Sequence, residues 1–331
     1  MRVFDESALN KAVSKMLGKA VTCSDYRTKE LEGGSIGNTL LIEGTAQDCS
    51  GEAALFKVVL KFTSNWGREL DPDSWRREFD LYMSELDSVF SGSFRWPKCY
   101  YSEIGDKENQ LWLEYIEGVS GLSLTLDMFE RTARELGRFQ GKLYAEQPAF
   151  LQNIANLSKV DDLKNHYQAY KSWNIIHDCI HSEKSEIPEH LRKMLINVEE
   201  NTDEIFSRIE KLPVVLCHRD FWAENIFHTE SGIIAIDWDT VGWGYMGEDL
   251  ASLISDDVPL KITEYYQKCV PAYYEGFLEK ADISHIKDYC IYDLIRVMFG
   301  HKIVNWFLHE AESPEEKKRY IDWLQEIYEI N

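Results

Sequence analysis

Two acidic residues and one amide in the second half of the chain have the types and spacing that phosphoryl transfer needs. His218, Arg219 and Asp220, followed five residues later by Asn225, form an H-R-D-x-x-x-x-N pattern, and Asp237 follows after a short gap. When ATP donates a phosphoryl group, one carboxylate accepts the proton of the attacking hydroxyl, while an amide oxygen and a second carboxylate hold magnesium. The pattern is therefore typical of a phosphotransfer site. The alternative is an acid and an amide on ordinary surface turns.

The apolar segments around this pattern indicate how it is held. One strand-like apolar run ends at Cys217, and two more, joined by a turn, occupy 226–236. Asp220 and Asn225 then lie in a loop between strands. Asp237 lies at the end of a hairpin that can fold back toward that loop. Apolar neighbours bury such a loop, which favours a functional site over a surface turn.

The remaining periodicities predict an α+β protein with a small β-rich N-terminal lobe and a larger, mainly helical C-terminal lobe. In the first lobe, residues 1–117, we expect strands at 20–29, 39–44, 54–63, 98–103 and 110–115 and helices at 5–17 and about 73–90. In the second lobe, residues 118–331, we expect helices at 126–145, 160–181, 188–212, 260–280, 284–309 and 313–328.

A phosphotransfer site also needs a lysine on a strand of the small lobe and an acid on the next helix. In the strand at 54–63, the apolar residues form one face, whereas Lys57 and Lys61 share the other. Periodicity cannot separate the two lysines, and we favour Lys61 for its place in Val-Val-Leu-Lys-Phe. Glu78 is the candidate partner, ahead of Glu85. The alternatives are two lysines on a solvated face and an exposed helical acid.

Two further segments could contact a nucleotide. The turn Gly33–Asn38, with Gly34 and Ser35, allows close backbone approach to phosphates, although a plain hairpin turn explains it equally well. The apolar strand that ends near Glu114 runs into a linker, where main-chain groups of Glu114 and Ile116 could bind adenine. An ordinary connector between lobes is the alternative there.

The overall composition excludes several classes of partner. The chain has 36 basic and 57 acidic residues and a net charge of −21, so we expect neither nucleic acid nor an anionic membrane as a partner. Its seven cysteines have no zinc-binding spacing and suit free thiols in a reducing compartment. The N-terminal residues lack an apolar signal region. We therefore expect a cytoplasmic protein, either a monomer or a homodimer.

Taken together, these residues give the chain a family resemblance. From roughly residue 20 to residue 300 it resembles the aminoglycoside phosphotransferase and choline kinase group of protein-kinase-like small-molecule kinases. The segments that carry the resemblance are 113–118, 134–144, 218–225, 236–239 and 247–251. The resemblance implies a two-lobed kinase-like fold that uses ATP and Mg²⁺. It implies Asp220 as the catalytic base, Asn225 and Asp237 as magnesium ligands, and a structural role for Asp249.

The chain also departs from the family pattern. The family usually has glycine where Arg219 stands and histidine where Tyr144 stands. Trp222 makes the catalytic loop similar to that of the ketosamine kinases. These departures leave the phosphotransfer residues intact and leave the acceptor open. The absence of D-F-G and A-P-E motifs speaks against a protein kinase.

The acceptor is expected to be a hydroxylated small molecule, such as an aminoglycoside, an amino alcohol or a sugar-like compound. The aromatic residues that we expect near it are Trp222, Trp243, Tyr245 and Trp306. Aromatic faces and a negative surface field both favour a cationic acceptor over an anionic one. The rival interpretation is a non-catalytic kinase-like binding protein, such as a spore-coat or scaffold component.

Overall fold

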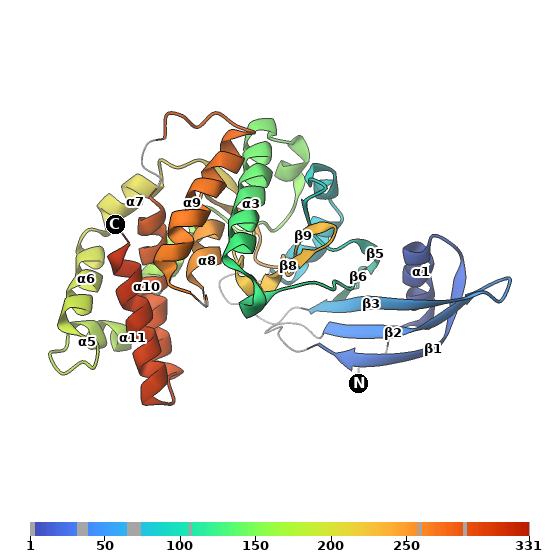
Figure 1. Cartoon of the computed structure of the whole chain (residues 1–331), viewed down its shortest axis with the longest axis horizontal. Coiled ribbons are helices and arrows are strands. Elements are labelled where there is room, and N and C mark those ends of the chain that lie inside the picture. The colour runs from blue at the N-terminus through green and yellow to red at the C-terminus, as the bar shows by residue number, and fades with distance from the viewer. Residues whose placement is uncertain are drawn as a thin grey trace. The chain divides into compact units, whose positions relative to one another are not determined.

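The computed structural model describes residues 4–31, 39–64, 74–105, 108–256, 258, 260–286 and 290–330 (Figure 1). The chain forms two compact units. Unit 1 comprises Met1–Gly118, Ala149–Leu157 and Thr229–Thr240, and unit 2 comprises Val119–Pro148, Ser158–His228 and Val241–Asn331. Two short segments that the sequence places in the C-terminal lobe thus belong to unit 1. Among the described residues, no helix combines the length and the apolar character needed to cross a membrane.

Unit 1 is built on a five-stranded antiparallel sheet with the order β1-β2-β3-β6-β5. Its strands are β1 (Val21–Glu30), β2 (Thr39–Asp48), β3 (Ala53–Ser64), β5 (Cys99–Glu103) and β6 (Glu108–Glu114). All five lie where the sequence predicts strands. The alternation in β3 is also as predicted, since Phe56, Val58, Leu60 and Phe62 are all buried.

The first helix covers this sheet. Helix α1 (Glu6–Leu17) is capped by Asp5, whose side chain accepts the backbone N–H of Ser7, and the helix packs against β1 and β5. Leu9 of this helix joins Val58 and Trp112 of the sheet in one buried cluster. This apolar packing fixes the sheet, and with it the position of the lysines on β3.

The second helix of unit 1 is shorter than the sequence suggests. Helix α2 (Ser74–Tyr82) packs on β3 and β6. The prediction of a single helix over about 73–90 is therefore wrong. The Ser84 hydroxyl donates to the Leu81 carbonyl and accepts the N–H of Leu86, which ends the helix. A short 3₁₀ helix at Leu86–Val89 follows.

A small parallel pair of strands completes unit 1. The two-residue strand β4 (Phe94–Arg95), which the sequence did not predict, pairs with β9 (Gly232–Ala235). Just after β9, the buried indole of Trp238 meets the rings of Phe90 and Trp96 edge-on, at centroid distances of 5.8 and 6.0 Å. This aromatic contact anchors the segment that follows β9.

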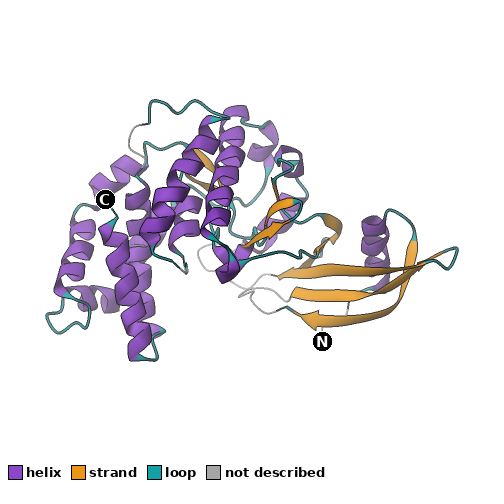
Figure 2. Cartoon of the chain, in the orientation of Figure 1, coloured by secondary structure: helices purple, strands orange, loops and turns teal. Residues whose placement is uncertain are grey.

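Unit 2 is mainly helical (Figure 2). Its helices are α3 (Leu126–Glu146), α4 (Asp162–Lys171), α5 (Asn174–His181), α6 (Glu189–Glu200), α7 (Thr202–Ile209), α8 (Glu248–Ser255), α9 (Ile262–Leu278), α10 (Ile291–His309) and α11 (Pro314–Glu329). Helices α3 and α9 lie side by side (Figure 1). A Cβ atom at Gly137 would lie 2.1 Å from the Tyr273 carbonyl oxygen, and one at Gly276 would lie 2.1 Å from that of Arg134. The two glycines therefore permit this close approach.

Three other helix predictions need correction. The helix expected over 160–181 breaks between α4 and α5, where the Ser172 hydroxyl donates to the Ala169 carbonyl. The helix expected over 188–212 breaks at Asn201, whose side-chain amide donates to the Asn197 carbonyl. In both places a polar side chain competes for the backbone groups that a continuous helix would use. Helix α10 begins at Ile291, not at 284, after a left-handed Cys290.

The strands of unit 2 lie next to the H-R-D segment. Strand β7 (Val214–Cys217) pairs antiparallel with β10 (Gly242–Tyr245), which the sequence did not predict, and β8 (Ile226–Thr229) follows the H-R-D loop. A Cβ atom at Gly242 would lie 1.8 Å from the Ser158 hydroxyl oxygen. Only glycine allows β10 to approach Ser158 this closely.

Candidate active site

The predicted lysine and helix acid are paired in unit 1. Lys61 Nζ, near the end of β3, lies 2.6 Å from Glu78 Oε2 on α2, and it also donates to Asp237 Oδ1 after β9. The side chain of Glu78 is 1% exposed and that of Lys61 is 15% exposed. The structure thus brings together three of the residues that the sequence singles out.

These contacts keep Lys61 charged. Burial alone would lower its pKa, but the negative charges of Asp237, Glu78 and Asp239 raise it above the ordinary value. An ammonium group on the central strand whose raised pKa favours the cationic form suits contact with phosphate.

Helix α2 also fixes the backbone around Asp237. Glu78 Oε1 accepts the N–H of Trp238 at 3.3 Å, and Arg77 donates to the Asp239 carbonyl at 2.9 Å. Asp237 has a left-handed backbone, with φ at 64°. Such a conformation is costly for a residue with a side chain and is concentrated at functional sites. The sequence did not predict the role of Arg77, and no local pattern distinguishes it from an ordinary helical arginine.

The alternative candidates for the lysine and the helix acid, Lys57 and Glu85, lie outside the cluster around Lys61. The side chain of Lys57 is 45% exposed and forms an ion pair with Glu117, and its Nζ lies 5.1 Å from the centre of the Tyr115 ring. Glu85 is exposed and precedes the 3₁₀ helix, where its carbonyl accepts the Ser88 hydroxyl. Neither residue belongs to the Lys61 cluster.

The other predicted nucleotide contacts are at the end of β6 and in the glycine turn. The N–H of Glu114 donates to the Lys98 carbonyl at 2.9 Å, and its carboxylate pairs with Arg95. A contact from Glu114 to adenine would therefore have to use its carbonyl oxygen. Ile116 is half-buried in the linker that follows. The turn Gly33–Asn38, with Gly34 and Ser35, lies outside the described residues.

In unit 2, the H-R-D segment follows β7 and forms a compact loop. The side-chain amide of Asn225 donates at 2.9 Å both to Asp220 Oδ2 and to the Asp220 carbonyl. Because the amide nitrogen is engaged with Asp220, the amide oxygen of Asn225 points away from that carboxylate. Oxygen donors of this kind are the ligands that magnesium prefers, so Asn225 fits the metal-binding role that the resemblance implies.

A buried acid fixes the backbone of this loop. Asp249, on the first turn of α8, accepts the N–H groups of His218 and Arg219, both at 2.8 Å. Gln140 of α3 donates to the same carboxylate at 2.9 Å. Burial raises the pKa of Asp249 to about 6, although these hydrogen bonds act to lower it. Sequence reasoning assigned Asp249 a structural role through the resemblance, and it missed Gln140.

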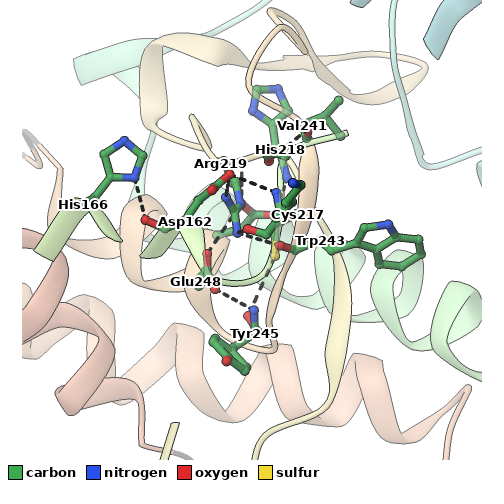
Figure 3. A network of polar contacts seen from close by, with 12 residues as sticks. Asp162, His166, Cys217, His218, Arg219, Val241, Trp243, Tyr245 and Glu248 are labelled. Atoms are coloured by element: carbon green, nitrogen blue, oxygen red, sulfur yellow. Dashed lines mark hydrogen bonds and ion pairs between the residues drawn. The ribbon is translucent and has the colours of Figure 1, made fainter. Parts of the chain in front are cut away.

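Arg219 ties the loop to two other elements (Figure 3). Its guanidinium donates to the carbonyls of Trp243 on β10, at 2.6 Å, and of Lys159 before α4, at 2.8 Å. It also lies 3.3 Å from Asp162 Oδ2 and 3.7 Å from Glu248 Oε2. Its φ of 68° is left-handed, the conformation that glycine adopts most readily. The structure therefore explains why glycine suits this position, and what Arg219 contributes instead.

The aromatic residues expected near the acceptor differ in their surroundings. Trp222 and Trp243 are half-buried, whereas Tyr245 is buried. Trp306 stacks on Trp323 with ring centres 5.3 Å apart, and Lys302 Nζ lies 4.6 Å from the centre of its ring. A cation of the protein itself therefore already occupies one face of Trp306.

Comparison with known families identifies the chain. Residues 71–280 match the model of the phosphotransferase enzyme family, APH. The chain belongs to this family. A sequence comparison with curated proteins gives no match.

Several solved structures share the fold of this chain, although their sequences are only distantly similar to it. An amicoumacin kinase, solved in complex with AMP-PNP and Ca²⁺, has a TM-score of 0.56 and 15% identity, covering 98% of this chain and 93% of its own. The choline kinase from Cryptosporidium parvum Iowa II has a TM-score of 0.56 and 14% identity, covering 92% and 90%. A microcompartment-associated aminopropanol kinase has a TM-score of 0.54 and 14% identity, covering 95% and 94%. The chain has the kinase-like fold and is a small-molecule kinase, as the sequence predicts.

Proposed function

We propose that this kinase transfers the γ-phosphate of ATP to a hydroxyl group of a small molecule. The observation that carries the proposal is the loop of unit 2, in which Asn225 holds the carboxylate of Asp220 at 2.9 Å. Asp249 fixes the backbone of the same loop. An oriented carboxylate on a rigid loop is what alignment and deprotonation of an acceptor hydroxyl require.

The other predicted residues receive roles that follow from their chemistry. Asp220 accepts the proton of the acceptor hydroxyl. Lys61, held cationic by Glu78 and Asp237, binds the phosphates. Asn225 and Asp237 offer the oxygen ligands for Mg²⁺, which, when bound, neutralises phosphate charge.

Four residues are proposed as nucleotide contacts outside this set. We assign main-chain contacts with adenine to Ile116 and to the carbonyl of Glu114, and close backbone contact with phosphates to Gly34 and Ser35. The support for these four assignments is the position of the segments in the sequence, together with the family resemblance.

The acceptor that we propose is a cationic, amine-bearing alcohol. The net charge of −21 supports this choice, because a negative surface field favours cations. The half-buried rings of Trp222 and Trp243 add support, since aromatic faces attract ammonium groups. We do not assign Trp306 to the acceptor site, because Lys302 already covers a face of its ring.

The test is a phosphotransfer screen. The protein is incubated with ATP and Mg²⁺ and with aminoglycosides, amino alcohols, sugars or ketosamines, and phosphorylated products are detected by mass spectrometry. Asp220→Asn should lower turnover of the best acceptor by about 10²–10⁴-fold. It should retain the increase in melting temperature that the nucleotide produces.

Asp203→Asn is the matched control, because Asp203 is an exposed acid on α7. Its turnover should equal that of the wild type. Wild-type turnover in Asp220→Asn would contradict the assignment of the base. Nucleotide binding without a product from any acceptor would favour the non-catalytic alternative.

A further inference from the structure

A cluster of potential metal ligands lies in unit 2 apart from the residues assigned to phosphotransfer. Two histidines, His177 and His181, lie on α5, and Glu199 lies near the end of α6, the helix that packs beside it (Figure 1). One ligand atom from each of the three side chains falls within 4.8 Å of the other two. The proposed function assigns no role to these three residues.

The spacing of the three side chains suits a transition-metal ion. The histidines are four residues apart, so they share one face of the helix, and their ring centres are 4.2 Å apart. His181 Nε2 lies 3.3 Å from Glu199 Oε2. Two ligands on a tetrahedral zinc ion, with bonds of 2.0–2.1 Å, are separated by about 3.4 Å. This hydrogen-bonded pair already has the separation of one tetrahedral edge, and the ligand atom of the exposed His177 lies within 4.8 Å of both partners.

The carboxylate of Glu199 is held from behind. His301 of α10, which is 2% exposed, places its Nε2 2.9 Å from Glu199 Oε1. The His301 ring is itself packed against Tyr167, with ring centres 5.2 Å apart. One carboxylate oxygen is therefore fixed by a buried imidazole while the other is directed at His181. Hydrogen-bonded support of this kind is typical of metal-binding carboxylates.

We propose that His177, His181 and Glu199 form a binding site for a transition-metal ion of the zinc class. Two imidazole nitrogens and one carboxylate oxygen suit zinc, whereas magnesium prefers oxygen ligands alone. Three protein ligands leave one tetrahedral position for water. A bound ion joins α5 to α6, and through Glu199 and His301 it is linked to α10. The site uses none of the proposed phosphotransfer residues and does not depend on their roles.

The experiment is a zinc titration of protein without an affinity tag, stripped of metal with a chelator. Isothermal titration calorimetry is performed in excess Mg²⁺, which occupies sites built from oxygen ligands. The wild type should bind one zinc ion. Two variants, His177→Ala and His177→Ala/His181→Ala, should bind zinc at least about 10-fold more weakly than the wild type does. Zinc should also raise the melting temperature of the wild type, and a chelator should reverse the increase.

The matched control is His190→Ala, because His190 is an exposed histidine on α6 whose ring contacts Gln325 instead of the cluster. It should bind zinc as the wild type does. His177 and His181 are exposed, and circular dichroism of both variants should match the wild type. Identical isotherms for the wild type and the double variant would overturn the proposal.

A second measurement identifies the ligands directly. X-ray absorption at the zinc edge should show nitrogen and oxygen ligands at about 2.0–2.2 Å. The chain has seven cysteines, of which Cys49 is exposed. A sulfur ligand at about 2.3 Å would place the ion on a thiol and would overturn the assignment.

Discussion

Lys61 differs from Lys57 in what surrounds its ammonium group. Both lie on β3 with the same orientation, but Lys61 contacts Glu78 and Asp237, whereas Lys57 is half-exposed and pairs with Glu117 at the surface. An exposed ion pair contributes little to stability or positioning. A lysine held by two acids keeps a defined position and charge.

Replacing each lysine in turn separates their roles. We expect Lys61→Ala to lower kcat/KM for the best acceptor by about 10²–10³-fold, because a preorganised charge at the phosphates is lost. Lys57→Ala is the matched control from the same strand and should stay close to the wild type. A larger loss at Lys57 would reverse the assignment, and circular dichroism should establish that both variants are folded.

Glu248 is a buried acid beside Arg219, and its ionisation depends on folding. Its Oε1 accepts the N–H of Tyr245 at 2.6 Å. Burial raises its pKa from the ordinary 4.5 to about 7, against the lowering effect of Arg219. The folded protein therefore binds this proton more tightly than the unfolded chain does.

The raised pKa of Glu248 makes the stability of the protein depend on pH. Between pH 4.5 and about 7, the free energy of unfolding should fall as the pH rises, because the folded state retains a proton that the unfolded state has lost. Glu248→Gln removes this contribution. Relative to the wild type, the variant should gain stability across that window, by an amount on the order of 3 kcal/mol. Urea unfolding at several pH values measures the difference, and a constant difference at all pH values would show that Glu248 does not titrate there.

At the scale of elements, the loop after β7 is held from two sides. Asp249 of α8 binds its backbone, and the Arg219 side chain connects it to β10 and to the segment before α4. The left-handed backbone of Arg219 opposes this arrangement, because a residue with a side chain is strained there. The contacts of the guanidinium offset that strain.

Two substitutions at Arg219 distinguish the strain from the contacts. Arg219→Gly and Arg219→Ala both remove the guanidinium, but only glycine relieves the left-handed backbone. Arg219→Ala should therefore be less stable than Arg219→Gly, by about 1–2 kcal/mol in denaturant unfolding. Both variants should have a lower kcat, since the loop that carries Asp220 loses its link to β10. Equal stability of the two variants would show that the backbone conformation carries no cost.

The sequence predicts elements well where apolar periodicity is decisive. The alternation of β3 and the spacing of α3 are examples. It fails where one polar side chain competes with the backbone, because the apolar spacing continues across the breaks at Ser84, Ser172 and Asn201. Strand β10 was not predicted because its two glycines are typical of a turn. In the structure, pairing with β7 holds it extended.

The candidate site shows the same limit. Period-two alternation places Lys57 and Lys61 on one face and cannot choose between them. The choice depends on Glu78 and Asp237, which are distant in sequence from Lys61 and which only the folded unit brings to it. Arg219 was visible as a departure from the family pattern, but its partners on β10 and before α4 were not.

At the scale of the whole molecule, charge should influence how the acceptor arrives. The protein carries a net charge of −21, and the field of exposed charges is screened within about 10 Å at 0.1 M salt. A cationic acceptor should be attracted over longer distances at low ionic strength.

Salt dependence of the kinetics tests this effect. The kcat/KM for a cationic acceptor should fall as salt is raised from about 0.01 M to 0.15 M, because steering is screened. A neutral acceptor that is also phosphorylated serves as the control and should change little. If the best acceptor is anionic, or if its kcat/KM does not respond to salt, the charge argument fails.

Unit 1 is built from three separate stretches of chain, so the ribosome completes it late in synthesis. Lys61 and its partner Asp237 are 176 residues apart. At an elongation rate of 5–20 residues per second, the ribosome needs roughly 9–35 s to add that many residues. During that time the nascent sheet carries Lys61 and Glu78 without the acid and the β9 strand that complete the unit. The N-terminal unit therefore starts to emerge first but cannot reach its native state until more than two thirds of the chain has been translated.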